Sequence, residues 1–244
     1  KEFKSVKNMV IREAERIRLD EITFEDEQMV DELDEEEEVL NSQSRWQMVN
    51  AYRGAQHVLC DDDSTWAEQE EVVQVLEQLW DAGLTVAAHQ LGKCWRDGLG
   101  VLPDDDKAEL WFRRSAEAGN DFSQYALGKL LQSRKRIKEA VDWYEKAAAQ
   151  GNQYANYRLG KLYLQGEDVP KDTARAISYL TRSAKGRNQY AQYVLGKLYL
   201  DRQDHEQAYY WFSQAAAQGN EYAQFFLDRW DSLKPPTVML SVTR

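Results

Sequence analysis

Residues 87–120 read AAHQLGKCWRDGLGVLPDDDKAELWFRRSAEAGN, and this stretch decides the fold because the chain repeats it. The triplet Leu-Gly-Lys begins at Leu91, Leu127, Leu159 and Leu195, and a weakened copy, Leu-Asp-Arg, begins at Leu227. The steps between successive copies are 36, 32, 36 and 32 residues. Self-similarity at such a period predicts a solenoid of stacked repeats.

Each repeat carries a second apolar pattern that keeps phase with the first. It consists of Ala108/Trp111/Phe112/Ala116, Ala140/Trp143/Tyr144/Ala148, Ala176/Tyr179/Leu180/Ala184 and Ala208/Trp211/Phe212/Ala216. Offsets of 3, 4 and 8 residues place each set on one face of a helix. One repeat is therefore a helix A around Leu-Gly-Lys, a loop that absorbs the 36/32 alternation, and a helix B.

Glycine has two predicted roles in the repeat. Gly-Asn follows helix B at Gly119, Gly151 and Gly219, and both residue types tolerate the left-handed conformation that ends a helix. Arg187 stands at this position in the remaining repeat, after Gly186, so we expect helix B to end one residue earlier there. The recurring Gly inside helix A predicts that helix B packs against it at close range.

The segments outside the full repeats differ in composition. Thr65 and Glu68 form the pattern of a capping box that opens a helix B, and an earlier helix A, from Trp46 to Leu59, would precede it. The predicted organisation is a helical segment at 1–19, an acidic disordered linker at 20–44, a degenerate capping repeat at 45–86, the full repeats with a closing helix at 87–230, and a tail at 231–244. The acidic linker is either a solvated spacer or an interaction segment.

Charge is concentrated at the start of the chain. The 244 residues carry a net charge of −11, and residues 1–40 hold 15 Asp and Glu against 6 Lys and Arg. This balance excludes a general nucleic-acid binder, and no apolar run is long enough for a membrane span. Two cysteines and the lack of a secretory signal predict a cytoplasmic protein. Because the first residue is Lys1 rather than Met, we expect a piece of a longer protein.

The residues around 87–230 resemble Sel1-like repeats. The pattern is Ala-x-x-x-Leu-Gly-x-x-aromatic, then Gly-x-Gly-Val, then Lys-Ala-x-x-Trp-Phe, then Gly-Asn, as it stands at 87–120. The resemblance implies an all-α, right-handed α/α superhelical solenoid of tetratricopeptide-like repeats that serves as a non-catalytic scaffold for protein–protein interaction. Some members carry disulfides within each repeat, and this sequence does not.

The opening residues 1–14, KEFKSVKNMVIREA, resemble the segment that follows the nicking domain of MobL/MobP-type mobilisation relaxases. Several of these relaxases carry an acidic linker and Sel1-like repeats in the same order. The resemblance implies that this chain is the C-terminal arm of a bacterial conjugation protein whose catalytic domain lies upstream.

No catalytic constellation is present in the sequence. His57, His89 and His205 lie far apart and lack metal-ligand spacing, so no metal and no cofactor are expected. The Asp runs at 61–63 and 104–106 each precede a helix, where acids favour the N-terminal dipole. Cys60 and Cys94 are expected to be core thiols rather than a disulfide, and His89 a packing residue. The chain is therefore predicted not to be an enzyme.

The candidate partner-binding site is a stripe on the predicted concave side. An aromatic ring or His lies two residues before the Leu of each helix A, and a cation two residues after it, so each pair shares a helix face. The stripe comprises His89, Lys93, Tyr125, Lys129, Tyr157, Lys161, Tyr193, Lys197, Phe225 and Arg229. Either these aromatics pack between repeats, or the stripe binds an acidic peptide. A second row, Phe122, Tyr154, Tyr190 and Tyr222, is assigned to inter-repeat packing.

The function predicted from the sequence is a protein-interaction scaffold, as the arm of a mobilisation relaxase. The partner is a protein or an acidic peptide, and residues 20–38 of the chain itself are one candidate for that peptide. Two alternatives remain: a stand-alone Sel1-like adaptor in bacterial signalling, and an arm that binds single-stranded DNA by stacking. Nucleic acid binding through this chain is not expected, and neither is membrane insertion.

Overall fold

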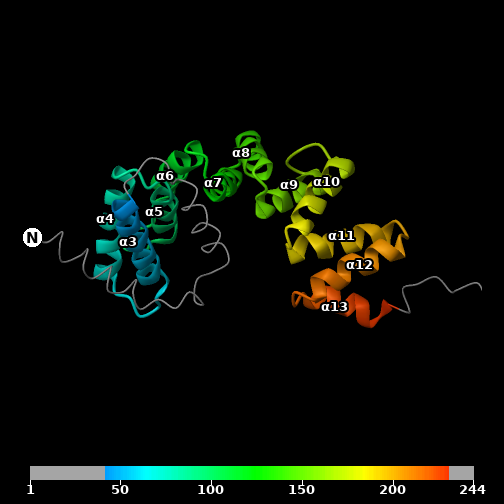
Figure 1. The fold of residues 1–244 in the computed structure, drawn as a ribbon. Coiled ribbons are helices and arrows are strands. Elements are labelled where there is room, and N and C mark those ends of the chain that lie inside the picture. The colour runs from blue at the N-terminus through cyan, green and yellow to red at the C-terminus, as the bar shows by residue number, and fades with distance from the viewer. Residues whose placement is uncertain (1–41, 231–244) are drawn as a thin grey trace, which may run out of the picture. The chain divides into compact units, whose positions relative to one another are not determined.

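The computed structural model describes residues 42–230, and every regular element in that range is an α-helix (Figure 1). The helices are α3 (Ser42–Cys60), α4 (Trp66–Asp81), α5 (Val86–Asp97), α6 (Asp105–Glu117), α7 (Asp121–Ser133), α8 (Ile137–Ala149), α9 (Gln153–Gln165), α10 (Thr173–Lys185), α11 (Gln189–Asp201), α12 (His205–Ala216) and α13 (Glu221–Asp228). Odd-numbered helices are helix A and even-numbered helices are helix B, as the sequence predicts. The chain divides into two compact units, Lys1–Leu130 and Leu131–Arg244, so α7 spans the boundary.

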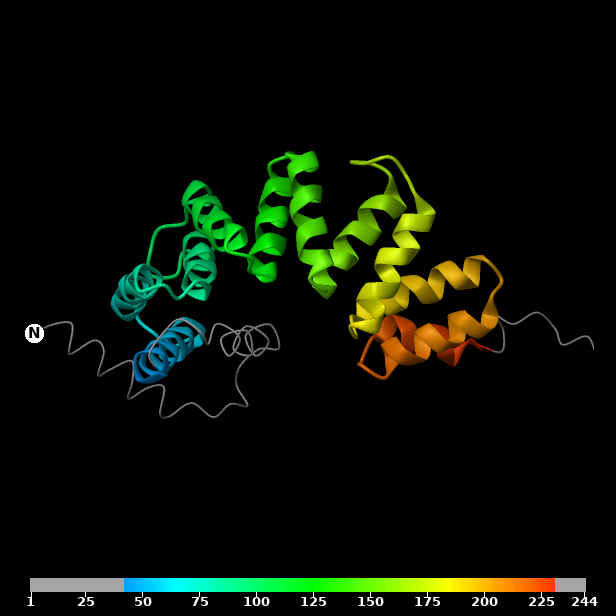
Figure 2. The same ribbon diagram turned by 45° about the horizontal axis from the view of Figure 1, so that its top comes forward.

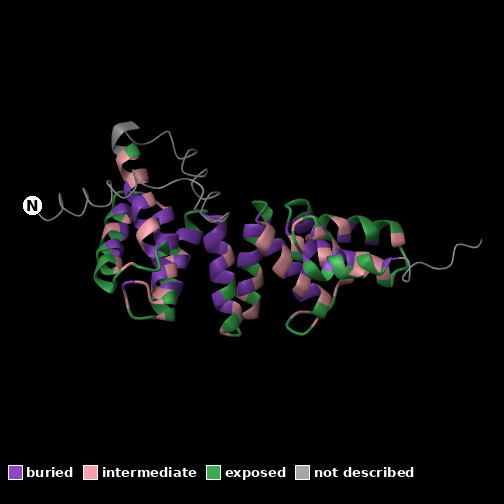
Figure 3. Cartoon of the chain, turned by 90° about the horizontal axis from the view of Figure 1, so that it is seen from below, coloured by how far each residue is buried: buried purple, intermediate pink, exposed green. Residues whose placement is uncertain are grey.

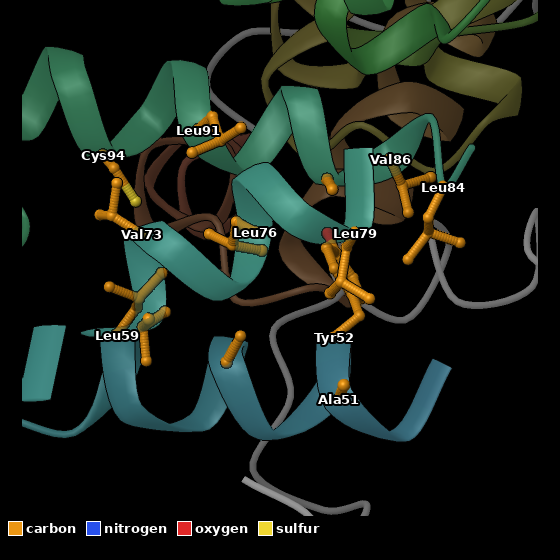
Figure 4. Close-up of a cluster of buried hydrophobic side chains, with 13 residues drawn as sticks. Ala51, Tyr52, Leu59, Val73, Leu76, Leu79, Leu84, Val86, Leu91 and Cys94 are labelled. Atoms are coloured by element: carbon orange, nitrogen blue, oxygen red, sulfur yellow. The ribbon is translucent and has the colours of Figure 1, made fainter. Parts of the chain in front are cut away.

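Unit 1 has its core between α3, α4 and α5 (Figure 4). Tyr52, Leu76 and Leu91, one from each helix, are completely buried there. The capping box that opens α4 is confirmed, because Thr65 Oγ1 accepts from the Glu68 amide and a Glu68 carboxylate oxygen accepts from the Thr65 amide at 2.8 Å. Helix α3 begins at Ser42, so the first of the described helices starts within the segment 20–44 that was predicted to be linker.

The close approach of helix B to the glycine of helix A is confirmed in three repeats. A Cβ atom built on Gly92 would lie 2.5 Å from Cδ1 of Phe112, and one built on Gly160 would lie 2.6 Å from Cγ of Leu180. Gly196 meets Phe212 in the same way, at 2.7 Å. These distances are shorter than van der Waals contact, so only glycine lets the two helices pack this closely.

The turns from helix B to helix A share one hydrogen-bonded motif. After α6, α8, α10 and α12, an Asn follows the left-handed residue. Its amide donates back to helix B, as from Asn152 to the carbonyl of Ala147 at 3.1 Å, and its side chain then caps the next helix. The expectation that helix B ends early before Arg187 is wrong. Helix α10 ends at Lys185, in register with α6 and α8, and Arg187 itself adopts the left-handed conformation with a φ of 66°.

Unit 2 contains α8–α13, whose successive helices lie side by side in Figure 2. Its core includes Leu180, Leu195 and Trp211, and a further cluster around Phe212. Phe226 of α13 stacks on Phe212 with ring centroids 4.7 Å apart. The closing helix was predicted to reach Trp230 but ends at Asp228; Trp230 is nevertheless buried against the same cluster. Buried residues line the interior of each unit in Figure 3.

The predicted helical segment at 1–19, most of the acidic linker and the tail at 231–244 lie outside the described residues.

Candidate protein-interaction surface

The predicted pairing of an aromatic ring with a cation is present in four helix A copies. In unit 1, Lys129 Nζ lies 5.7 Å from the centre of the Tyr125 ring on α7. In unit 2, Lys161 Nζ lies 5.8 Å from the Tyr157 ring and Lys197 Nζ 6.0 Å from the Tyr193 ring. Arg229 approaches Phe225 most closely, at 3.8 Å. Each cation is held over its ring by four-residue helical spacing and by cation–π attraction.

His89 departs from the rest of the stripe. It is buried on α5, its ring lies 5.6 Å from that of Phe112, and its Nδ1 atom lies 2.8 Å from Ser123 Oγ. Burial, followed by the nearby charges of Lys93 and Arg96, lowers the pKa of His89 to about 3. The expectation that His89 packs in the interior is therefore confirmed, and this residue does not present a ring to a partner. Lys93 is half-buried beside it.

Unit 2 joins the two aromatic rows into one surface. The Tyr157 and Tyr190 rings lie 6.3 Å apart, and the Tyr193 and Tyr222 rings 5.9 Å apart, so each pair bridges successive A helices. The predicted inter-repeat packing of Tyr190 and Tyr222 is thus confirmed. Yet Tyr190 is 57% exposed and Tyr222 71% exposed, and Phe225 is 52% exposed. Tyr190 and Tyr222 therefore pack between repeats and also remain accessible to a partner.

We call this surface the unit 2 tyrosine surface, and it comprises Tyr157, Lys161, Tyr190, Tyr193, Lys197, Tyr222, Phe225 and Arg229. The sequence reasoning left Tyr190 and Tyr222 out of the candidate site. A signal for them was present, because each lies three residues before a stripe residue and so projects from the same helix face.

The surface combines exposed rings with positive charge. Lys197 and Arg229 are exposed and Lys161 is half-buried. Glu221 and Asp228 also lie on α13, and Asp228 accepts a hydrogen bond from the Gln224 side chain at 2.8 Å. The tyrosine and phenylalanine side chains offer a large contact area and lose little conformational entropy on binding. The lysines and the arginine favour a ligand that carries carboxylates.

Residues 42–230 contain no group of three or more His, Cys, Asp or Glu side chains that could hold a metal ion. The predicted N-terminal role of the second Asp run is confirmed for Asp104, which accepts from the amides of Asp106 and Lys107 at 3.0 Å and caps α6.

The two cysteines differ from each other. Cys94 is a core thiol, as predicted, and burial raises its pKa to about 12. Cys60 is exposed at the end of α3, so the expectation of a core thiol is wrong for this residue. Its position follows from the greater length of α3, whose last residue extends beyond the core formed with α4. Cys60 and Cys94 do not form a disulfide with each other.

Among the described helices, none has both the length and the apolar character required to cross a membrane.

Solved structures of other proteins share this architecture. Protein c5321, a protective antigen of uropathogenic Escherichia coli with an SLR fold, matches with a TM-score of 0.64 and 27% identity over 85% of this chain. This chain spans about half of that protein, 49% of its length. A Sel1 repeat protein from Oxalobacter formigenes matches with a TM-score of 0.59 and 26% identity, over 80% of this chain and 86% of that one.

The immunity protein Pa5087 from Pseudomonas aeruginosa has a TM-score of 0.52 and 24% identity, over 81% of this chain and 74% of that chain, and shows the fold alone. No match was found among the curated proteins.

The paired helices, the glycine contacts and these structures define an α/α repeat solenoid, which confirms the predicted fold class. The model of the Sel1 repeat matches residues 85–120, 122–152, 153–188 and 189–220. The chain belongs to the Sel1 repeat family. Sel1-repeat proteins usually mediate protein–protein interactions and are generally non-catalytic.

Proposed function

We propose that the unit 2 tyrosine surface binds an acidic segment of a partner protein. The observation that carries this proposal is the set of three cation–aromatic pairs, on α9, on α11 and at the C-terminal end of α13, joined by the exposed rings of Tyr190 and Tyr222. Exposed tyrosines beside lysine and arginine have the chemistry of a binding hot spot for carboxylate-bearing peptides.

The order of segments extends the proposal to the whole chain. We infer that it is the C-terminal, non-catalytic arm of a mobilisation relaxase and acts in the cytoplasm, contacting other transfer or replication proteins. Support comes from the opening residues 1–14, the acidic run that follows them, and the repeats behind. The coding DNA upstream of Lys1 tests this: an upstream nicking domain with a His cluster and a catalytic Tyr is expected, and a secretory signal or a nearby start codon would contradict it.

Peptide selection tests the binding surface. A random peptide library would be panned on the full chain, and each enriched peptide assayed against Lys161→Glu/Lys197→Glu and against a control, Lys138→Glu/Lys146→Glu, that makes the same charge change on α8. Enriched peptides should be rich in Asp and Glu and should bind the control but not the first variant. An enrichment without acidic bias, or equal binding by both variants, would overturn the proposal.

A further inference from the structure

Helix α3 is the first helix of the described structure, yet it lacks an exposed face. From Gln47 to Leu59 every residue is buried or half-buried. Among the described helices, α4 is the one that packs most extensively on α3, and together with α5 it covers one side of that helix. A helix packed on one side only would expose a polar stripe along the other. The burial of α3 therefore indicates a second neighbour.

Two other A helices show the difference between an internal and a terminal position. Helix α9 packs between α8 and α10 and has no exposed residue from Gln153 to Leu164. Helix α13, which closes the described stack, exposes five of its 8 residues. The burial of α3 resembles that of α9 rather than that of α13. In the stack, the neighbour of an internal helix A on its other side is the element that precedes it in the chain.

The charges of α3 point to the chemistry of that neighbour. The helix contains Arg45 and Arg53 and no Asp or Glu. Both terminal nitrogens of Arg45 and the Nε atom of Arg53 are buried without a hydrogen-bond partner among the described residues. A buried guanidinium without an acceptor is costly, so the element that covers α3 must supply acceptors.

We propose that residues 20–38 cover the face of α3 away from α4, with their carboxylates paired to Arg45 and Arg53. This segment contains twelve Asp and Glu and no Lys or Arg, and Met29, Val30 and Leu33 supply apolar contacts. It is joined to α3 by residues 39–41, a link of three residues that ends in Asn41. The turns at 118–120, 150–152 and 186–188 have the same length and also end in Asn.

This placement differs from occupation of the cation stripe by residues 20–38. On α3 the acidic segment acts as a structural element of unit 1, and its charge is compensated there. The lysines and the arginine of the unit 2 tyrosine surface are then not used by the chain's own acidic run.

Zero-length cross-linking of the full chain tests the contact. A carbodiimide joins a lysine amine to a carboxylate that touches it, so Arg53→Lys places a reactive amine at the proposed contact, and Arg202→Lys, an exposed position in unit 2, is the matched control. Mass spectrometry should find Arg53→Lys linked to a peptide from 20–38, in at least about tenfold higher yield than Arg202→Lys. Links to other carboxylates only, equal yields from the two variants, or no link while native lysines react, would each overturn the proposal.

Hydrogen exchange distinguishes the acidic segment from residues 1–19, the other candidate to cover α3. Neutralising Asp31, Glu32, Asp34 and residues 35–38 to Asn or Gln should speed amide exchange in α3 by about tenfold or more, because the cover is lost. The matched variant Val6→Asp/Val10→Asp places charge at two apolar positions of residues 1–19 and should leave α3 protected. If the second variant exposes α3 and the first does not, residues 1–19 are the cover and the proposal fails.

Discussion

The Nδ1 atom of His89 on α5 lies 2.8 Å from Ser123 Oγ on α7, and Ser123 in turn donates to Ser115 of α6 at 2.7 Å. All three side chains are buried, so a chain of polar groups joins three successive helices of unit 1. The imidazole is neutral in this environment, because burial opposes its charged form.

The burial of His89 predicts a loss of stability in mild acid. Its pKa is about 3 in the folded chain and 6.5 in the unfolded one, so the unfolded state binds the proton more readily. Stability is complete above pH 6.5 and declines as the pH falls toward 3. Between pH 7.5 and pH 5 the loss from this group is about 2 kcal/mol. Urea unfolding of the wild type and of His89→Gln measures it, and the variant should lose correspondingly less over the same range. Equal losses would show that other groups cause the acid sensitivity.

The contact between Gly160 and Leu180 predicts a coupled pair of substitutions. Gly160→Ala places a Cβ 2.6 Å from Leu180 Cγ and should cost about 1–3 kcal/mol of unfolding free energy. Leu180→Val removes part of the obstruction, so the double variant should be less destabilised than the sum of the two single ones by at least about 0.5 kcal/mol. Denaturant titration of the four proteins gives this coupling. If the two losses of unfolding free energy simply add, α9 and α10 move apart to accommodate the added methyl group.

Arg187 predicts a stabilising substitution. It holds a φ of 66°, which an L-residue adopts at a cost and glycine adopts freely. Arg187→Gly should therefore raise the unfolding free energy by about 1 kcal/mol. The control Ser178→Gly, at an exposed position inside α10, should lower it by about 0.5 kcal/mol. A destabilised Arg187→Gly would indicate that the arginine side chain makes a contact worth more than the backbone strain.

Tyr157 and Lys161 provide a test of the tyrosine surface that does not depend on folding. The Tyr157 ring is half-buried and Lys161 lies over it, so Tyr157→Ala/Lys161→Glu removes one anchor and reverses one charge. We expect loss of an acidic peptide ligand with nearly unchanged helicity, measured by fluorescence anisotropy and circular dichroism. Retained binding would place the peptide elsewhere on the chain.

Single-stranded DNA is predicted not to bind. Stacking on exposed tyrosines suits bases as well as peptides, but a net charge of −11 opposes a polyanion. A labelled oligothymidylate should show no binding by the full chain at 150 mM salt. Binding that weakens steeply as salt rises would instead favour a nucleic-acid function.

The repeat period, the two helices of each repeat and the close contact at the helix A glycine could all be predicted from residue spacing. The hydrogen bond between His89 and Ser123 was harder to predict than the burial of His89, although a signal for it exists. Ser123 stands where later repeats have Ala155, Ala191 and Ala223. The one polar residue at this position therefore occurs in the repeat that follows His89, the only His of the stripe. The exposure of Tyr190 and Tyr222 depends on how tightly successive A helices approach, which residue spacing alone does not determine. The conformation of Arg187 shows that the repeat geometry overrides the preference of one residue.

Because long and short loops alternate, the true period of the sequence is a pair of repeats. The two long loops end alike: the amide of Asp104 donates to the carbonyl of Trp95 at 2.7 Å, and that of Asp172 to Tyr163 at 2.9 Å. Lys107 and Arg175 lie over those same two rings. Trp95 and Tyr163 are 68 residues apart, which is one long and one short repeat together. A gene duplication or deletion of that length preserves the alternation, whereas a change by one repeat brings two loops of the same kind together. Solenoids of this lineage should therefore grow and shrink by pairs of repeats.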